Sequence, residues 1–226
     1  MRRAVLALLL SALPAAAQGP NLAPAAEAAA PGPVRQLALA QEIHDLGLGR
    51  EDAVLLLAAV RLARGTELRP ATGWTHEGAG TPAPAETAAP GLPRDPASPE
   101  ALTLALMMAE GSPALADVAA DVAAALDRPA PGRGHVSAAA MVLPGGKADS
   151  WRIAFNGSLP AEIALTGDGS GNLDLTVTDE AGTEICREDG PRDRAFCAFT
   201  PARNGFFTVT VANRAGGGNR YRLVTN

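Results

Sequence analysis

The chain has very little lysine and few aromatic residues. Lys147 is its single lysine, and acidic residues outnumber basic ones, which gives a net charge of -5. A mildly acidic chain has no general attraction for nucleic acid or for anionic lipid, which argues against both classes of partner. Aromatic residues make up 4% of the sequence. A folded core therefore has to be built mainly from leucine, valine, isoleucine and alanine.

Long apolar runs are also missing. The one candidate lies at the N-terminus, where Met-Arg-Arg precedes an apolar stretch over residues 4–13 and the small residues that end at Ala17. A membrane anchor would need roughly 20 apolar residues, whereas a charged start, a short apolar core and an A-x-A sequence are typical of a secretory signal peptide. The sequence predicts a signal peptide over residues 1–17, no membrane span, and a periplasmic or secreted product.

Only two cysteines are present, Cys186 and Cys197. They flank a segment whose centre, Asp-Gly-Pro at residues 189–191, is a strong turn signal. In an exported chain this pattern predicts a disulfide across a β-hairpin, and two free buried thiols are the alternative. In the simplest pairing of the two cysteines, Ile185 and Phe199 do not both point inward. A disulfide there requires a bulge or an offset register.

Residues that commonly carry catalysis are scarce. The three histidines, His44, His76 and His135, lie far apart in the sequence and lack the spacing of metal-binding helices. We interpret them as surface or capping residues. The chain has no G-x-S-x-G elbow, no Walker loop and no dinucleotide fingerprint. The sequence therefore predicts neither catalytic residues nor a cofactor.

The first half of the chain has the pattern of a helical region. Residues 18–34 are rich in alanine and proline and are predicted to be a disordered leader. Residues 35–128 then show helical periodicity, interrupted by a proline-rich stretch over 65–99 that predicts an irregular loop. Trp74 lies in this loop. It either fills a hydrophobic gap or recognises a ligand.

About four short helices are expected in this region. In the first, Leu39, Ile43 and Leu46 fall on one face, and the Gly-Leu-Gly at 47–49 is expected to end the helix. The second begins after Glu51 and Asp52 and is apolar on every side, so that neighbours should surround it. The last two begin with the same pair, a serine N-cap followed by proline, at Ser98-Pro99 and Ser112-Pro113.

Near residues 129–138 the period changes from helical to alternating. Short alternating segments follow, with glycine, asparagine, aspartate and proline between them, as in antiparallel sheets that bury one face. We therefore predict an α+β protein, with a helical N-terminal region and an antiparallel β-sandwich over residues 136–226. The residues expected to face its core are Trp151, Ile153, Phe155, Ile163, Leu165, Leu173, Leu175, Val177, Phe207, Val209, Val211, Tyr221 and Leu223.

Three segments of this second half resemble the bacterial pre-peptidase C-terminal (PPC) domain: "GDGSGNLDLTVTDEAGTEIC", "CAFTPARNGFFTVTVAN" and "NRYRLVTN". The helical region is similar to the segment before such domains in uncharacterised exported bacterial proteins. The resemblance implies a jelly-roll-like sandwich and a role in binding, secretion or enzyme maturation rather than catalysis. In "NLDLTVTD" this chain has Asn172, Thr176 and Thr178 where members of the family often have a carboxylate and two aromatics.

The loop before the strand at 173 is a candidate calcium site. Asp168, Asp174 and Asp179 supply carboxylates, and Ca²⁺ needs six to eight oxygen ligands. The strand context excludes an EF-hand, and a solvated Gly-Asp turn explains the same residues. Both interpretations remain open on the sequence.

The sequence as a whole favours an exported, non-catalytic binding or envelope-associated module whose ligand is a protein or a polysaccharide. One alternative is a secreted hydrolase that acts on a polymer, with its site between the helices and the sandwich. Another is a chaperone or inhibitor of a peptidase.

Overall fold

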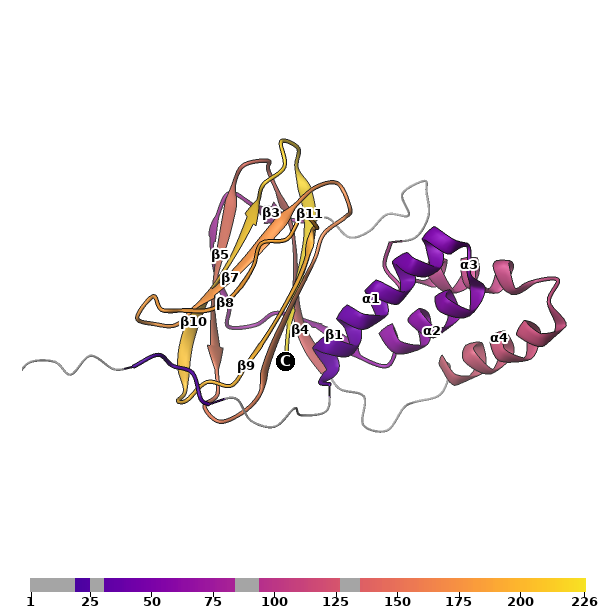
Figure 1. Cartoon of the computed structure of the whole chain (residues 1–226), viewed down its shortest axis with the longest axis horizontal. Helices are drawn as coiled ribbons and strands as arrows, with labels where there is room; N and C mark the ends of the chain where they lie inside the picture. Colours follow the sequence, from indigo (N-terminus) through magenta and orange to yellow (C-terminus); the bar gives the residue numbers. More distant parts are fainter. Residues whose placement is uncertain (1–18, 25–30, 84–93, 127–134) are drawn as a thin grey trace, which may run out of the picture.

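The structure, a computed structural model, describes residues 19–24, 31–83, 94–126 and 135–226. Four helices lie to one side of a two-sheet β-sandwich (Figure 1). The predicted signal peptide lies outside the described residues. Among the helices that are described, none is both long and apolar enough to cross a bilayer. The helices are α1 (Pro33–Arg50), α2 (Ala53–Ala63), α3 (Pro99–Ala109) and α4 (Pro113–Leu126).

The sandwich consists of a six-stranded sheet, here sheet A, and a five-stranded sheet, sheet B. Sheet A has the order β1-β4-β11-β6-β9, with β3 also pairing with β4, and sheet B has the order β2-β5-β10-β7-β8. All pairs are antiparallel except β1 with β4. The strands are β1 (Glu67–Pro70), β2 (Thr75–Gly78), β3 (Thr81–Pro82), β4 (His135–Leu143), β5 (Ala148–Phe155), β6 (Ala161–Thr166), β7 (Leu173–Thr178), β8 (Glu184–Glu188), β9 (Arg194–Phe199), β10 (Gly205–Asn213) and β11 (Asn219–Thr225).

The alternating residues predicted to face the core do so. All thirteen are buried between the two sheets and belong to one hydrophobic cluster. Three phenylalanine rings, Phe155, Phe199 and Phe207, meet edge-on or tilted at one end, with centroids 5.1–5.7 Å apart. Such aromatic pairs add to the free energy gained by burial. The α+β class and the β-sandwich are therefore confirmed.

The proline-rich stretch at 65–99 differs from its prediction as a loop. Its first part contributes β1 and β3 to sheet A and β2 to sheet B. Proline is tolerated here because these short strands lie at sheet edges, where one side of the backbone needs no partner. Trp74 packs against the core, its ring 5.8 Å from that of Trp151. The segment that follows α2 is thus part of the sandwich and not a separate linker.

The sequence predicted that the first helix ends at the glycines at 47 and 49, but it does not. α1 continues to Arg50 and ends at Glu51, which takes a left-handed conformation with φ 53°. A Cβ on Gly47 would lie 3.0 Å from the side chain of Leu56, so this glycine permits close packing of α1 against α2. Asp52 then caps α2 by accepting hydrogen bonds from the N–H groups of Val54 and Leu55.

The buried face of α1 is also not the predicted one. Leu39 and Leu46 are 39% and 44% exposed, whereas Gln41 and His44 are buried. Small and polar residues fill this face because it is pressed between α2 and the sandwich and the space is narrow. The expectation that His44 is a surface or capping residue was therefore wrong.

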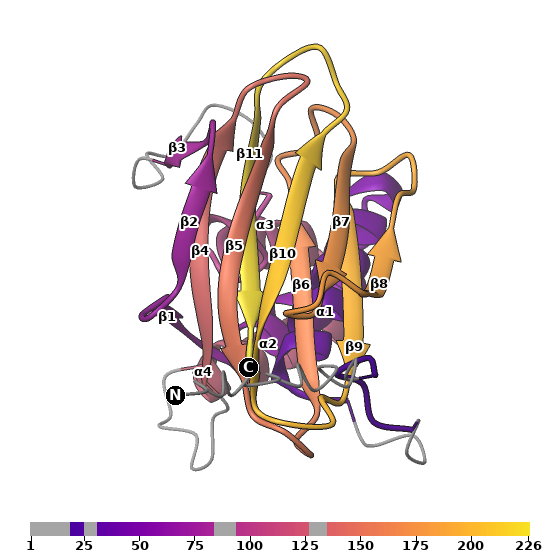
Figure 2. The same ribbon diagram turned by 90° about the vertical axis from the view of Figure 1, so that its left-hand side faces the viewer.

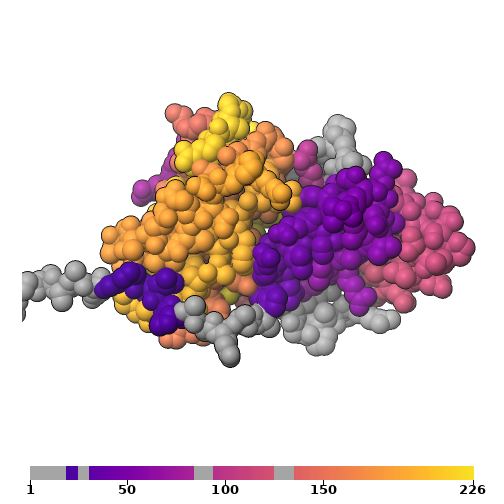
Figure 3. Space-filling model, in the orientation of Figure 1, coloured from indigo at the N-terminus to yellow at the C-terminus, as the bar shows by residue number. Residues whose placement is uncertain are grey.

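α1 lies directly on the outer face of sheet A (Figures 2 and 3). In Figure 3 the indigo helix meets the orange strands along a continuous seam. Glu162 on β6 caps the helix, since its carboxylate accepts hydrogen bonds from the N–H groups of Gly32 and Arg35. A small hydrophobic cluster seals the contact: Val34, Leu37, Ala38, Leu68, Val136, Ala138, Ala164, Phe196 and Val224.

Part of the predicted disordered leader is ordered. Asn21 is fully buried at the end of the sandwich. Its N–H donates to Asp179 Oδ2 at 2.9 Å, and its side-chain oxygen accepts from the N–H of Arg203 at 2.9 Å. Further along, Val34 is already in α1. Composition predicted disorder because the segment has no periodicity, but the contacts of Asn21 hold residues 19–24 against the sandwich.

Cys186 and Cys197 form the predicted disulfide. The predicted hairpin, however, is wrong. β8 belongs to sheet B and β9 to sheet A, so the connection crosses the sandwich and the disulfide joins the two sheets at one edge. The pairing of β7 with β8 contains a bulge at Ile185, which lets both Ile185 and Cys186 pack toward the core.

Candidate functional site

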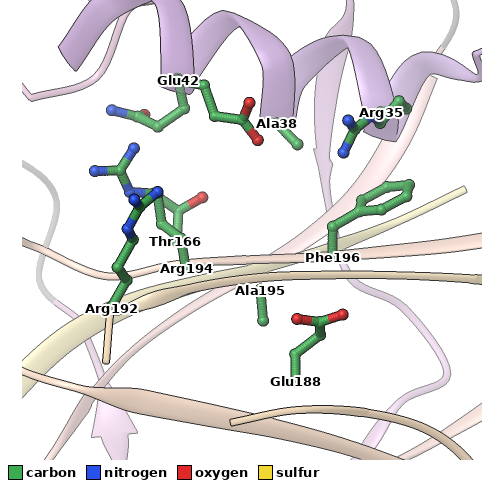
Figure 4. Close-up of a pocket in the computed structure, with 10 residues that line it drawn as sticks. Arg35, Ala38, Glu42, Thr166, Glu188, Arg192, Arg194, Ala195 and Phe196 are labelled. Atoms are coloured by element: carbon green, nitrogen blue, oxygen red, sulfur yellow. The ribbon is translucent and has the colours of Figure 1, made fainter. Parts of the chain in front are cut away.

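A cleft of about 350 Å³ lies between α1 and the β9 edge of the sandwich (Figure 4). One wall is the side of α1 that carries Arg35, Ala38 and Glu42. The floor is the outer face of sheet A. Side chains alternate along β9, so that Arg194 and Phe196 point outward into the cleft, whereas Cys197 points into the core. Glu188 of β8 adds a residue of sheet B to the lining, so that both sheets and the helix form the cleft.

Charged side chains dominate the lining. In Figure 4, Arg35 lies beside Phe196, and Arg192 and Arg194 approach from the strand side. The Arg35 guanidinium is 4.8 Å from the centre of the Phe196 ring, a cation–π contact. Arg192 is exposed, and its guanidinium has no hydrogen-bond or ion-pair partner among the described residues. This group is thus available to a ligand.

A polar network behind the cleft fixes α1 on the sheet. Arg194 forms an ion pair with Asp45 of α1. Gln41 donates hydrogen bonds to Asp45 Oδ1 at 3.1 Å and to the carbonyl of Arg94 at 2.9 Å. Next to it, Arg222 of β11 pairs with Asp95 at 2.7 Å. The helix and the sandwich are joined here by charge as well as by apolar contact.

The carboxyl groups of this network are held in their charged form. Burial by itself raises the pKa of Asp45, but the ring of His44 and the positive charge of Arg194 outweigh it, so that the pKa lies below 3.8. Burial likewise raises the pKa of Asp95. The charge of Arg222 and the hydrogen bond from the N–H of Ala97 outweigh burial, so that the pKa of Asp95 is lowered. Both groups therefore stabilise the folded protein while they are ionised.

Acid should weaken this network. A carboxyl group whose pKa is lowered on folding contributes stability above its unfolded value, near 3.8, and loses that contribution as the pH falls through the lower folded value. We expect the free energy of unfolding to stay constant from about pH 7 to 5 and to decline below about pH 4. The pKa values of Asp168 and Asp179 are lowered too and act in the same direction.

Denaturant titrations at a series of pH values measure this effect. Asp95→Asn should lower stability at neutral pH and make the acid decline shallower. Asp117→Asn, on an exposed carboxyl of α4, is the matched control and should leave both unchanged. An acid decline of the same steepness in Asp95→Asn and the parent protein would contradict the role given to the Asp95–Arg222 pair.

The candidate calcium residues are engaged separately. Asp168 accepts a hydrogen bond from the N–H of Ser170 at 2.9 Å with one oxygen, and from the N–H of Arg220 at 3.0 Å with the other. Burial raises the pKa of Asp168, but these bonds and the nearby Arg94 hold it below its usual value. Asp168 thus closes the 167–172 turn onto the start of β11.

The other two carboxylates also have partners of their own. Asp174 forms an ion pair with Arg214 at 2.5 Å. Asp179 accepts from the N–H groups of Asn21, Ala181 and Thr183. Within the described ranges, no three histidine, cysteine, aspartate or glutamate side chains form a group that could hold a metal ion.

Calcium is therefore expected to leave stability unchanged. The melting temperature of the protein should be the same in millimolar calcium and in chelator, because the oxygens of Asp168 and Asp179 are already occupied by backbone N–H groups. Differential scanning calorimetry measures it. A rise of several degrees with calcium but not with magnesium would contradict this assignment and restore the calcium site.

The remaining histidines have different surroundings. His135 is exposed at the start of β4. His76 on β2 is partly buried, with Nε2 3.1 Å from Asp149 Oδ1 and its ring 4.5 Å from that of Trp151. Tyr221 donates a hydrogen bond to Asp149 at 2.7 Å and accepts one from Trp151 Nε1 at 2.9 Å. This network lies inside the sandwich and connects its two sheets.

Sequence reasoning missed the charged residues of the cleft. Glu188 lies next to the turn signal at 189–191, which points to a solvated turn, and Arg35, Glu42 and Arg192 gave no signal. A partial signal does exist in "RAFCAF", because a buried cysteine at 197 implies that Arg194 and Phe196 face outward. What α1 brings opposite them depends on how the helix docks, which no local pattern specifies.

No protein-family model and no curated protein sequence matches this chain. Among solved structures, the pre-peptidase C-terminal domain of a collagenase from Bacillus anthracis matches with 15% identity and a TM-score of 0.34, covering 40% of this chain and 88% of that one. PliG, a periplasmic inhibitor of g-type lysozyme from Aeromonas hydrophila, has 16% identity and a TM-score of 0.31, over 44% and 90% of the two chains. The Yersinia pseudotuberculosis-derived mitogen has 13% identity and a TM-score of 0.31, over 40% and 84%. The assignment of the sandwich rests on the sheets themselves.

Proposed function

We propose that the protein is an exported, non-catalytic binding module that holds its ligand in the cleft between α1 and β9. The observation that carries this proposal is the unpartnered guanidinium of Arg192 at a cleft of about 350 Å³. A charged group that has no partner in the folded protein gives up hydrating water, but no protein contact, when it binds an oppositely charged ligand group. Charge-assisted hydrogen bonds of this kind are among the stronger polar contacts.

The form of the cleft supports binding by a fixed surface. Its walls are held by the Arg194–Asp45 pair and by the capping contact of Glu162 with the start of α1. The disulfide at Cys197 lies on the strand that forms the floor. A surface that is ordered before binding pays less conformational entropy when the ligand arrives.

Export is supported by the disulfide and by the predicted signal peptide. Disulfides persist in oxidising compartments such as the bacterial periplasm and the extracellular space. The sequence resemblance of residues 136–226 to the PPC domain fits a module that binds rather than catalyses. We accordingly expect the ligand in the cell envelope or outside the cell.

A pull-down from the envelope fraction tests the proposal. The protein without residues 1–17 serves as bait, together with Arg192→Glu and with Arg61→Glu, a matched reversal of an exposed arginine on α2 outside the cleft. Arg192→Glu should capture at least about tenfold less material, equal to ~1.4 kcal/mol, and Arg61→Glu should capture as much as the parent. Equal capture by all three proteins would overturn the proposal.

A further inference from the structure

We infer that the ligand of this cleft is a peptide segment in extended conformation, with side chains of both charges, which pairs with β9 as an added strand. The inference rests on the proposed function, since it names the class of ligand for the same cleft. It depends on the position of β9 at the edge of sheet A, on four charged side chains without an ion pair, and on the alternation of side chains between the two faces of an extended peptide.

The position of β9 offers a place for another strand. β9 (Arg194–Phe199) is the outermost strand of sheet A, and β6 is its one pairing partner among the described strands. An edge strand presents backbone N–H and C=O groups that a further chain can pair with. Addition of an extended peptide to such an edge is a common mode of peptide recognition. The disulfide at Cys197 holds this edge to the second sheet.

The charges beside this edge are of both signs. Arg35 and Arg192 are positive, Glu42 and Glu188 are negative, and all four line the cleft. None of the four forms an ion pair within the part of the chain that the structure describes. In Figure 4 they stand around the opening rather than meeting across it. A ligand with both carboxylate and ammonium groups satisfies this pattern, because complementary charge sets the specificity of an interface.

Polymers with one kind of charge, or none, fit the pattern less well. An acidic polysaccharide would meet Glu42 and Glu188 unfavourably, and a neutral one would leave all four charges without an oppositely charged partner. A peptide also has backbone groups for β9 and side chains that alternate between two faces. Apolar side chains on its inner face would meet Ala38 and the half-buried ring of Phe196.

Binding of designed peptides tests the inference. The probes are four eight-residue peptides with blocked ends: one alternates valine with glutamate and lysine, and the others are all acidic, all basic or uncharged at the same positions. A fifth is the mixed-charge peptide with alternate backbone nitrogens methylated along one edge, which removes the hydrogen bonds of strand pairing and keeps the side chains. Fluorescence polarisation gives the affinities.

The mixed-charge peptide should bind at least about tenfold more tightly than the other three, and methylation should abolish its binding. Arg192→Glu and Glu42→Lys should each weaken it, while Arg61→Glu and Glu77→Lys, on exposed residues outside the cleft, should not. Equal binding of the uncharged peptide, or of the methylated one, would overturn the inference.

Protease treatment separates this inference from the proposed function. The envelope fraction is digested with a broad-specificity protease before the pull-down. If capture that depends on Arg192 survives digestion, the binding module stands and the peptide ligand is wrong. If the parent, Arg192→Glu and Arg61→Glu baits capture equally before digestion, both fall.

Discussion

Replacing Asp149 by alanine is expected to destabilise the protein by about 3 kcal/mol, the scale seen when one partner of a buried charged network is removed. Asp149 is fully buried. It accepts hydrogen bonds from the hydroxyl of Tyr221 at 2.7 Å and from the N–H of Gly80 at 2.7 Å, and it lies 3.1 Å from His76. Its loss leaves a buried hydroxyl and a backbone N–H without their acceptor.

The same network keeps the phenol of Tyr221 protonated. Burial, together with the negative charge of Asp149, raises the pKa of Tyr221 far above its usual range. The hydroxyl therefore keeps the proton that it donates to Asp149. Because Tyr221 is on sheet A and both Asp149 and Trp151 are on sheet B, the two hydrogen bonds of the Tyr221 hydroxyl link the sheets across the core.

Guanidinium titration measures the effect of Asp149→Ala. Asp149→Asn keeps the size of the side chain and should cost less, because its amide oxygen can still accept one of the bonds. Asp117→Ala, on an exposed residue of α4, should change stability little. A loss below about 1 kcal/mol for Asp149→Ala, the worth of a single hydrogen bond, would show that the network does not hold the sheets together.

Removal of the disulfide is the second large effect. The pair Cys186→Ala and Cys197→Ala should lower the free energy of unfolding by about 3 kcal/mol, because the bond joins cysteines with a sequence separation of 11 and restricts the unfolded chain. Alanine avoids placing a hydroxyl at Cys197, which is buried. Since the bond joins β8 to β9, its loss should also loosen the β9 edge and weaken ligand binding.

Chemical denaturation of the double variant gives the stability. Reducing agent should bring the parent protein to the same value and leave the variant unchanged, which separates loss of the bond from loss of packing. If the variant were as stable as the oxidised parent, the disulfide would have no structural role at this edge.

The sandwich could be predicted because its signal is local. Leu173, Leu175 and Val177 alternate with outward residues, and a strand with one buried face must have that period. The pairing of two cysteines in an exported chain follows from chemistry. Whether β8 and β9 form a hairpin depends on which sheet each strand joins. The turn signal between them is the same whether they pair in one sheet or belong to different sheets, so it could not decide between these two arrangements.

The parts that could not be predicted depend on contacts distant in sequence. Gly47 predicted the end of a helix from the sequence, but Leu56 of α2 packs against it and the helix continues. The strands within 67–82 take their structure from β4 and β5, so composition alone suggested a loop. Asn21 is ordered by Asp179, more than a hundred positions along the chain.

The cleft shows the same limit. Arg192 and Glu42 come from regions that meet because α1 docks on sheet A, and that docking is specified by small residues such as Ala38 and Ala164 and by the cap from Glu162. None of these carries a recognisable motif. The loop at 167–172, which does resemble a ligand site in the sequence, is instead closed by its own hydrogen bonds.

Hydrogen exchange of the protein with and without its envelope ligand tests the site most directly. The protein is exchanged alone and after saturation with the material that it captures from the envelope fraction. We predict slower exchange confined to α1 around residues 35–42 and to residues 192–199, with none on β2, β5 and β10 of sheet B. Protection of β2, β5 and β10 with no change at 35–42 and 192–199 would place the ligand on the opposite face and contradict the account.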